Sequence, residues 1–207
     1  MLVFWEQRLV FLATPKAGST AVESALESLA EVAILRPPLL KHTPVYRYRR
    51  FLQPYLEKTA GAEFTVVALM REPIGWLGSW YRFRQREDVL DPAKSTRGMS
   101  FDDFVTGYMA RPQPPFADVG AQSRFLQGTD GRPVDHIFCY EDIGAFVTFL
   151  EDRLGHDIQL PRVNVSPTAA TVLSPEVEEK LRSRCADEFE LYGRVVADGT
   201  AAAAALA

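Results

Sequence analysis

The sequence predicts a single α/β domain, in which a central, mainly parallel sheet is flanked by helices. Three short runs, at 9–13, 64–70 and 134–140, are predicted as strands, and the first two are almost wholly apolar, as is typical of buried strands. Strands that alternate with helices favour a parallel sheet. The 207 residues, 47% of them hydrophobic, fit one ordinary domain. We expect this domain to span 1–193 and the Ala-rich segment 194–207 to be a disordered tail.

The first two strands each lead into a helix. LVFLA at 9–13 precedes a stretch, 22–33, whose apolar residues fall near helical spacing. Residues 36–50 contain three prolines and gather basic and aromatic residues, which predicts a loop that leads into a short helix. FTVVALM at 64–70 is the second strand, and Pro73 suits the first turn of the helix that follows it.

The second half of the chain is less regular. Residues 84–133 show little periodicity and contain a Pro-rich stretch, as in insertions that shape substrate pockets. VDHIFCY at 134–140 predicts the third strand. The helix after it has a candidate N-cap in Asp142 and a stop at Gly155. A closing helix is predicted over about 174–192.

Composition and charge exclude several classes of protein. Lys and Arg number 23 and Asp and Glu 27, so the net charge of −4 provides no global field for nucleic acid. Cys139 and Cys185, the two cysteines, lie far apart in no metal-like spacing, and we expect reduced thiols and no structural zinc. The first residues form neither a signal peptide nor a membrane span. We therefore expect a cytoplasmic protein, of an oligomeric state that the sequence does not indicate.

The turn after the first strand has the features of an anion site. It consists of TPKAGST, residues 14–20. The first N–H groups of a helix have no intrahelical partner, and the helix dipole adds partial positive charge there. Lys16 adds a full charge, and Gly18 lets the backbone approach a ligand closely. The hydroxyls of Ser19 and Thr20 can bind its oxygens. Taken alone, the turn is as compatible with an ordinary loop between a strand and a helix.

Two better-known nucleotide loops do not fit this turn. The P-loop of nucleoside triphosphatases needs a glycine, four residues, and then Gly-Lys-Ser/Thr. Here Lys16 precedes Gly18, and Phe11 stands five residues before the lysine. The Gly-x-Gly-x-x-Gly pattern of dinucleotide sites is also missing from the turn.

TPKAGST resembles the 5'-phosphosulfate-binding loop of sulfotransferases that use 3'-phosphoadenosine-5'-phosphosulfate (PAPS). A second signature of that family is a strand that ends in Arg, with a serine eight residues later, as in VVALMREPIGWLGSWYRF, residues 66–83. The resemblance implies that Arg71 and Ser79 hold the donor's 3'-phosphate. A charged fork at a strand end, with a hydroxyl about two helical turns on, suits this role. FCYEDI at 138–143 and the closing helix also resemble the family. The resemblance assigns the 5' side of the donor to Lys16, Ala17, Gly18, Ser19 and Thr20.

The resemblance implies a P-loop nucleotide-hydrolase-like sulfotransferase fold and a PAPS-dependent sulfotransferase. Such an enzyme moves a sulfuryl group to a hydroxyl of a carbohydrate or small metabolite and releases adenosine 3',5'-bisphosphate. We expect no metal, because Lys16, the loop amides and Arg71 supply positive charge. No equivalent of the C-terminal Arg-Lys-Gly segment of the small-molecule cytosolic branch is present, which favours the carbohydrate-type or bacterial branches. The alternatives are an ATP-dependent P-loop kinase and a non-catalytic nucleotide-binding module.

His42 is the candidate general base, with Lys16 as the other catalytic residue. His42 lies in the loop that should return over the carboxyl edge of the sheet, where its position resembles that of the catalytic His or Glu of carbohydrate-type enzymes. A surface histidine beside Lys41 is the plainer alternative. His136, inside a strand, and His156, after a helix stop, are weaker candidates. Glu23 is an alternative base.

Two further sets of residues, one basic and one aromatic, bear on how an acceptor could bind. Basic residues that could line an entrance for an anionic acceptor such as an acidic sugar, or form a solvated helix face, are Lys41, Arg47, Arg49 and Arg50. Aromatic residues that we expect in the core and not as a sugar-stacking platform are Trp76, Trp80 and Phe83.

Overall fold

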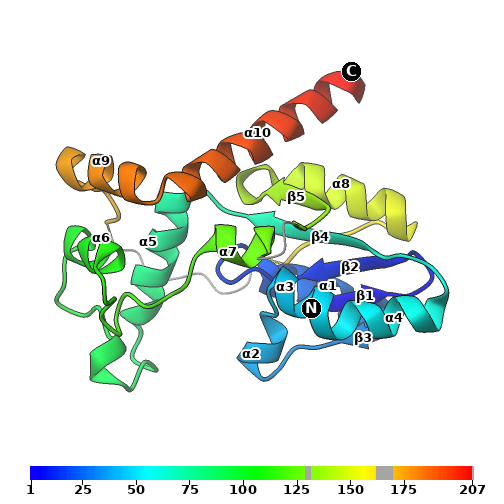
Figure 1. Cartoon of the computed structure of the whole chain (residues 1–207), viewed down its shortest axis with the longest axis horizontal. Coiled ribbons are helices and arrows are strands. Elements are labelled where there is room, and N and C mark those ends of the chain that lie inside the picture. Colours follow the sequence, from blue (N-terminus) through cyan, green and yellow to red (C-terminus); the bar gives the residue numbers. More distant parts are fainter. Residues whose placement is uncertain (129–131, 162–169, 207) are drawn as a thin grey trace.

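The computed structural model describes residues 1–128, 132–161 and 170–206, without the side chains of 200–206 (Figure 1). Its strands form a sheet with the order β3-β1-β2-β4-β5. The strands are β1 (Leu2–Phe4), β2 (Leu9–Leu12), β3 (Val32–Ala33), β4 (Thr65–Met70) and β5 (His136–Cys139). The α/β class and the three predicted strands, which correspond to β2, β4 and β5, are confirmed.

The sheet is mixed, so the prediction of a mainly parallel sheet was wrong. β2 pairs in parallel with β4, and β4 with β5. β1, by contrast, is antiparallel to both β2 and β3. The cause is a tight turn between Trp5 and Arg8, whose N–H donates to the Trp5 carbonyl at 3.2 Å. A turn this short can join only antiparallel neighbours.

Helices cover both faces of the sheet. In chain order the α-helices are α1 (Ser19–Leu26), α2 (Pro38–Lys41), α3 (Val45–Arg47), α4 (Gln53–Ala60), α5 (Pro73–Arg84), α6 (Phe101–Met109), α7 (Gln122–Gln127), α8 (Ile143–Leu154), α9 (Pro175–Arg184) and α10 (Ala186–Leu206). Short 3-10 segments are η1 (Glu27–Leu29), η3 (Pro92–Lys94) and η4 (Tyr140–Asp142), and η2 (Tyr48–Leu52) is π-helical. η1 and β3 replace the end of the first predicted helix.

Alternating side chains of the strands feed two cores. Val10, Leu12, Val66 and Ala68 pack with residues of α3, α4, α7 and α10, among them Val45, Leu56, Phe125 and Leu191. Leu9, Phe11, Val67 and Leu69 pack with residues of α1 and α8, among them Val22, Leu26, Phe146 and Leu150. Because successive side chains of a strand point to opposite faces, each strand serves both cores. The result is a sheet between two layers of helices.

A third apolar cluster lies beyond the end of the sheet, where α5, α6 and α9 gather on the left of Figure 1. Helix α6 falls within 84–133, which we expected to be irregular. It begins with a capping box, in which Ser100 and Asp103 each accept a hydrogen bond from the other's main chain.

Most of the predicted helix boundaries are close to the observed ones. Pro73 is the first residue of α5, and Gly155, with φ 68°, ends α8. Asp142 precedes α8, but its side chain makes no capping hydrogen bond. The closing helix is interrupted at Cys185 into α9 and α10. α10 continues beyond 193, and Val195 is buried in the core, so ordered structure extends past the start predicted for the tail.

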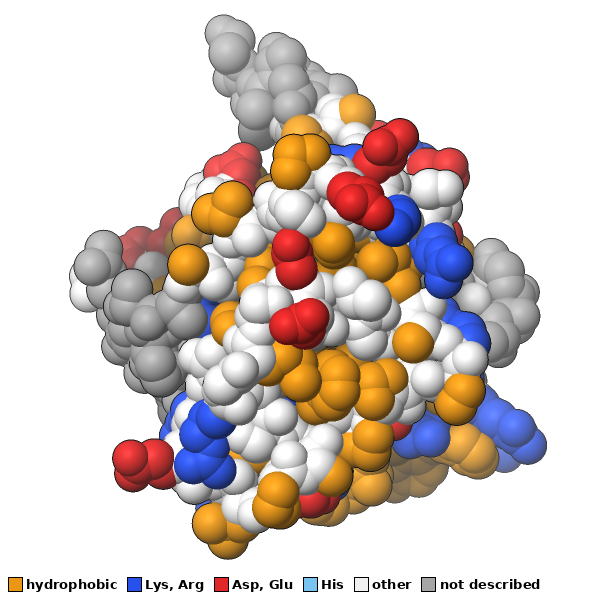
Figure 2. Space-filling model, turned by 90° about the vertical axis from the view of Figure 1, so that its left-hand side faces the viewer, with side chains coloured by type: hydrophobic (Ala, Val, Ile, Leu, Met, Phe, Trp, Pro, Cys, Tyr) orange, Lys and Arg blue, Asp and Glu red, His pale blue; other side chains and the backbone are white. Residues whose placement is uncertain are grey.

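Two further observations concern membrane-spanning helices and the distribution of surface charge. No helix in the described parts of the chain combines the length and the apolar character that crossing a membrane requires. Figure 2 faces the end of the molecule where α5, α6 and α9 lie, and shows Lys and Arg side chains in separate groups toward its edges. The described side chains therefore form no continuous basic patch on this face.

Candidate functional site

The candidate site lies where the parallel strands end. β2, β4 and β5 run in the same direction, so the residues that follow them meet at one edge of the sheet. These are the loop 14–20 after β2, Arg71 after β4, and Tyr140 after β5. Ligands of open α/β sheets commonly bind outside the carboxyl ends of the strands.

The loop 14–20 has an unusual backbone. Lys16 has φ 62° and Gly18 has φ 75°, so two residues of this short loop adopt the left-handed conformation. Helix α1 begins directly afterwards, at Ser19. The N–H groups of Ser19 and Thr20 meet no main-chain acceptor within the described ranges. The loop thus presents free amides at a helix N-terminus, as the sequence predicted.

Tyr140 covers the loop glycine. A Cβ atom on Gly18 would lie 2.7 Å from Cε2 of Tyr140, closer than van der Waals contact permits. The guanidinium of Arg71 stacks on the same ring, with its central carbon 4.8 Å from the ring centroid. Gly18, Tyr140 and Arg71, from three separate strand ends, thus form one packed layer.

Arg71 is fixed by its main chain as well as its side chain. Its Nη1 lies 3.4 Å from the carbonyl oxygen of Lys16. Its N–H donates to Oε1 of Gln122 at 2.9 Å, and its carbonyl accepts from Nε2 of the same residue at 2.8 Å. Ser79 lies in α5 and is buried. Of the predicted pair, Arg71 thus directly follows β4, and Ser79 lies in α5, the helix that comes after it.

The side chain of Lys16 packs against two aromatic rings of α5. Its Nζ lies 3.2 Å from the ring centroid of Phe83 and 4.8 Å from that of Trp80. Burial, and secondly the charges of Arg86 and Arg84, lower the pKa of Lys16 to about 7. Trp80 and Phe83 thus contact this amine, while Trp76 is in the core as expected and donates from Nε1 to the Pro15 carbonyl at 2.8 Å.

His42 contacts the end of β2. Its Nδ1 lies 2.7 Å from the carbonyl oxygen of Ala13, the residue before the loop. A carbonyl can only accept, so this contact is a hydrogen bond when Nδ1 carries the proton. In the neutral ring Nε2 then has a free lone pair, as a general base requires. Burial is the main cause that lowers the pKa of His42, and the charge of Lys41 contributes less.

The alternative candidates for the general base are Glu23, His136 and His156, and their positions suit this role less well than that of His42. Glu23 is buried and forms a salt bridge with Lys41 at 2.6 Å, and its other oxygen accepts from the amino group of Met1 at 3.1 Å. Both carboxylate oxygens of Glu23 are thus engaged by ammonium groups. His136 is exposed on β5, with its ring 5.7 Å from that of Phe149, and His156 is also exposed.

The predicted basic entrance is wrong for two of its four members. Arg49 is buried, where it donates to the carbonyls of Arg132 and Pro133 and pairs with Asp135 at 3.1 Å. It ties η2 to the start of β5. Lys41 pairs with Glu23, and its Nζ lies 3.4 Å from the hydroxyl of Thr20. The exposed members are Arg47 and Arg50.

Unsatisfied polar atoms gather at this edge of the sheet. Within the described ranges, four buried side-chain polar atoms have no hydrogen-bond partner, and three of them are Oγ1 of Thr14, Nε of Arg71 and Nε1 of Trp80. All three residues belong to the loop or contact it directly. Buried polar groups are normally paired, and unpaired ones mark places where a further partner can bind. No three His, Cys, Asp or Glu side chains among the described residues form a group that could hold a metal ion.

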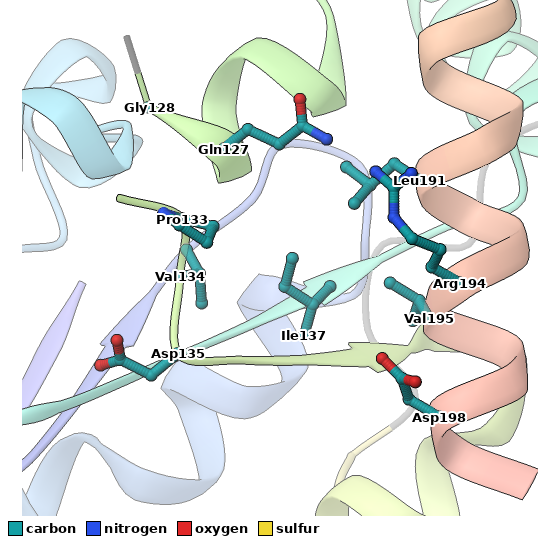
Figure 3. A pocket seen from close by; sticks show the side chains of 10 residues that line it. All are labelled: Gln127, Gly128, Pro133, Val134, Asp135, Ile137, Leu191, Arg194, Val195 and Asp198. Carbon is teal, nitrogen blue, oxygen red and sulfur yellow. The ribbon is translucent and has the colours of Figure 1, made fainter. Parts of the chain in front are cut away.

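A separate hollow lies at the opposite end of β5. It has a volume of about 460 Å³, and Figure 3 shows its walls, formed by α7, α10 and residues at the start of β5. Its apolar lining includes Val134, Ile137, Leu191 and Val195. Asp135 at its rim is already paired with Arg49. Because it lies at the amino end of the strand, this hollow is not part of the site around the loop.

Two site residues were missing from the set predicted by sequence. Tyr140 directly follows a strand, as Arg71 does, and that position was a usable signal. Gln122 lies in a segment that we predicted to be irregular, and its contact with Arg71 has no signal in the local sequence. Comparison of the chain with models of protein families, with curated proteins and with solved structures gave no match.

Proposed function

We propose that the protein is a PAPS-dependent sulfotransferase that acts on a hydroxyl of a carbohydrate or small metabolite. The observation that carries this proposal is the convergence of residues from separate segments of the chain on one loop. His42 bonds to Ala13 at its start, Arg71 contacts the carbonyl of Lys16, and Tyr140 covers Gly18. The segments that resemble the family in sequence are thus neighbours at the carboxyl edge of the sheet.

The residues have distinct roles in the proposed reaction. The acceptor oxygen attacks sulfur in line, a new O–S bond forms, and the bond from sulfur to the 5'-phosphate oxygen breaks. His42 takes the acceptor proton on Nε2, and the loop amides with Lys16 stabilise the charge on the leaving phosphate. Arg71 and Ser79 hold the 3'-phosphate of the nucleotide, which leaves as adenosine 3',5'-bisphosphate.

Lys16 must move for this role. Its amine now packs against Phe83 and Trp80, so its side chain has to turn toward the donor when the donor binds. An anion beside it would also raise its pKa from about 7 and keep it protonated. The rings therefore hold Lys16 in a resting position.

The test is an assay with sulfur-labelled PAPS and a panel of hydroxylated acceptors, in buffer with a metal chelator. Transfer of label to an acceptor, lost on Arg71→Ala, supports the proposal. Transfer of phosphate from ATP that needs magnesium, with none of sulfur from PAPS, would show that the protein is a kinase. Binding of PAPS without transfer to any acceptor would favour a nucleotide-binding module.

A further inference from the structure

One face of α5 carries small residues between two arginines. Gly75, Gly78, Ser79 and Arg82 fall at positions i, i+3, i+4 and i+7, which share a helix face. The glycines leave room for neighbours. Nε of Arg71, at the amino end of this face, lies 3.5 Å from the place where a Cβ of Gly75 would be.

The other end of the face is covered by Arg82 and Thr171. Long side chains of a helix lean toward its N-terminus, and Nη1 of Arg82 lies 3.4 Å from the Cβ position of Gly78. The same nitrogen donates to the hydroxyl of Thr171 at 3.2 Å. Cγ2 of Thr171 would be 3.0 Å from a Cβ on Gly78, so any larger residue at this position would have to displace Thr171 slightly. The two guanidinium groups thus approach one face from opposite ends.

Neither arginine is neutralised by a carboxylate. Within the described ranges Arg71 and Arg82 form no salt bridge, and Nε of Arg71 is buried without a partner. Glu72, the acid next to Arg71 in sequence, accepts a hydrogen bond from the N–H of Gly75 at 2.6 Å. Burial, and secondly the charge of Arg71, lower the pKa of Arg82. Two partly buried like charges are costly together, and a bound dianion would relieve that cost.

We infer that Arg82 and Thr171 complete, with Arg71 and Ser79, a subsite for a phosphate dianion. This inference rests on the proposed function, in which the dianion is the 3'-phosphate of the donor nucleotide. Arg82 supplies the second positive charge, in place of the C-terminal Arg-Lys-Gly segment that this chain lacks. The guanidinium forks of the two arginines suit the oxygens of a phosphate, and Ser79 and Thr171 add hydroxyl donors.

The experiment compares two nucleotides by calorimetry, adenosine 3',5'-bisphosphate and adenosine 5'-monophosphate, which lacks the 3'-phosphate. Arg82→Ala should weaken binding of the bisphosphate by about 10- to 100-fold, the range for a lost charged hydrogen bond, and that of the monophosphate by less than about threefold. Thr171→Val keeps the shape of the side chain and should cost the bisphosphate several-fold. Arg182→Ala is the control, because Arg182 is exposed on α9 and pairs with Glu178 at 2.8 Å.

The outcomes separate this inference from the proposed function. If the wild type prefers the bisphosphate and Arg71→Ala removes that preference, but Arg82→Ala and Thr171→Val leave it intact, the inference is overturned and the proposed function stands. Equal losses for both nucleotides in Arg82→Ala also overturn it. If the wild type binds both nucleotides equally, the proposed function fails, and the inference fails with it. Should Arg82→Ala not fold, Arg82→Gln and Thr171→Val decide by the same criteria.

Discussion

The side-chain amide of Gln122 makes two hydrogen bonds to the main chain of Arg71, at 2.9 Å to the N–H and at 2.8 Å to the carbonyl. Gln122 is itself held by α10. Glu188 accepts hydrogen bonds from the N–H of Gln122 at 3.3 Å and from that of Ser123 at 2.7 Å, and so caps α7. The C-terminal helix thereby positions the residue that we propose to bind the nucleotide.

Replacement of Gln122 by alanine should loosen Arg71. Gln122 is buried, and loss of its two hydrogen bonds leaves main-chain groups of Arg71 unpaired, so we expect the free energy of unfolding to fall by about 2 to 4 kcal/mol. The affinity for adenosine 3',5'-bisphosphate should fall as well. Chemical denaturation of Gln122→Ala beside Arg124→Ala, an exposed position on the same helix, measures the difference. Equal stability of the two variants would show that the amide contact contributes little.

The contact of Gly18 with Tyr140 predicts a steric effect that can be separated from backbone strain. Gly18→Ala should destabilise more than Gly61→Ala. Both glycines have positive φ, 75° and 63°, but only Gly18 has a neighbour where its Cβ would lie. The strain common to both is about 1 kcal/mol, and the clash should add about 1 to 3 kcal/mol. Tyr140→Ala in the Gly18→Ala background should remove the destabilisation that the clash causes, but not the backbone strain. A double-mutant cycle would reveal this result.

The low pKa of Lys16 predicts that anion binding depends on pH. With a pKa of about 7, Lys16 is largely neutral above pH 7 in the free protein. A bound anion favours the charged form, so binding takes up a proton, and affinity should fall by up to about tenfold for each pH unit above 7. Calorimetry in buffers of different ionisation enthalpy would detect that proton. Lys16→Arg should abolish the dependence, because arginine stays charged. Constant wild-type affinity between pH 7 and pH 9 would contradict this account.

His42→Ala should separate binding from catalysis. Because His42 is proposed to act on the acceptor hydroxyl and not to bind the donor, donor affinity should change little, while turnover should fall by about 10² to 10⁴. The pKa of His42 is lowered, chiefly by burial, so the wild-type rate should rise with pH through one group below about 6.5 and be constant at neutral pH. His42→Glu should retain part of the activity. Normal turnover of His42→Ala with a verified acceptor would exclude His42 as the base.

The strands and helices with strong local signals were predictable. β2 and β4 lie in almost wholly apolar runs, β5 lies in the strand-like segment VDHIFCY, and α5 begins at a proline. α6 was also visible, since Phe101, Phe104, Val105, Tyr108 and Met109 have helical spacing after the cap Ser100, but the neighbouring prolines led us to expect irregular structure. β1 was missed although residues 1–5 are all apolar, because we assessed this stretch only as a signal peptide or a membrane span. Without β1, the antiparallel part of the sheet had no basis in the pattern.

Only those site residues whose positions depend on neighbouring residues in the sequence could be predicted. Arg71 directly follows β4, and Lys16 lies in the short loop between β2 and α1, so the strands largely determine where both residues lie. The contact of Gln122 with Arg71 spans 51 residues of sequence, and that of Trp76 with Pro15 spans 61. Such contacts depend on how the helices pack. The orientation of the Lys16 amine likewise depends on Phe83, which α5 brings over the loop.

Calorimetry of the wild-type protein with adenosine 3',5'-bisphosphate and with ATP, each in the presence and absence of magnesium, tests the central claim most directly. We predict that the bisphosphate binds at least about tenfold more tightly than ATP, because a charged hydrogen bond to its 3'-phosphate is worth about that factor or more. Magnesium should not change this result. Tight, magnesium-dependent binding of ATP together with weak binding of the bisphosphate would contradict the assignment of the loop 14–20 and Arg71 to a PAPS site.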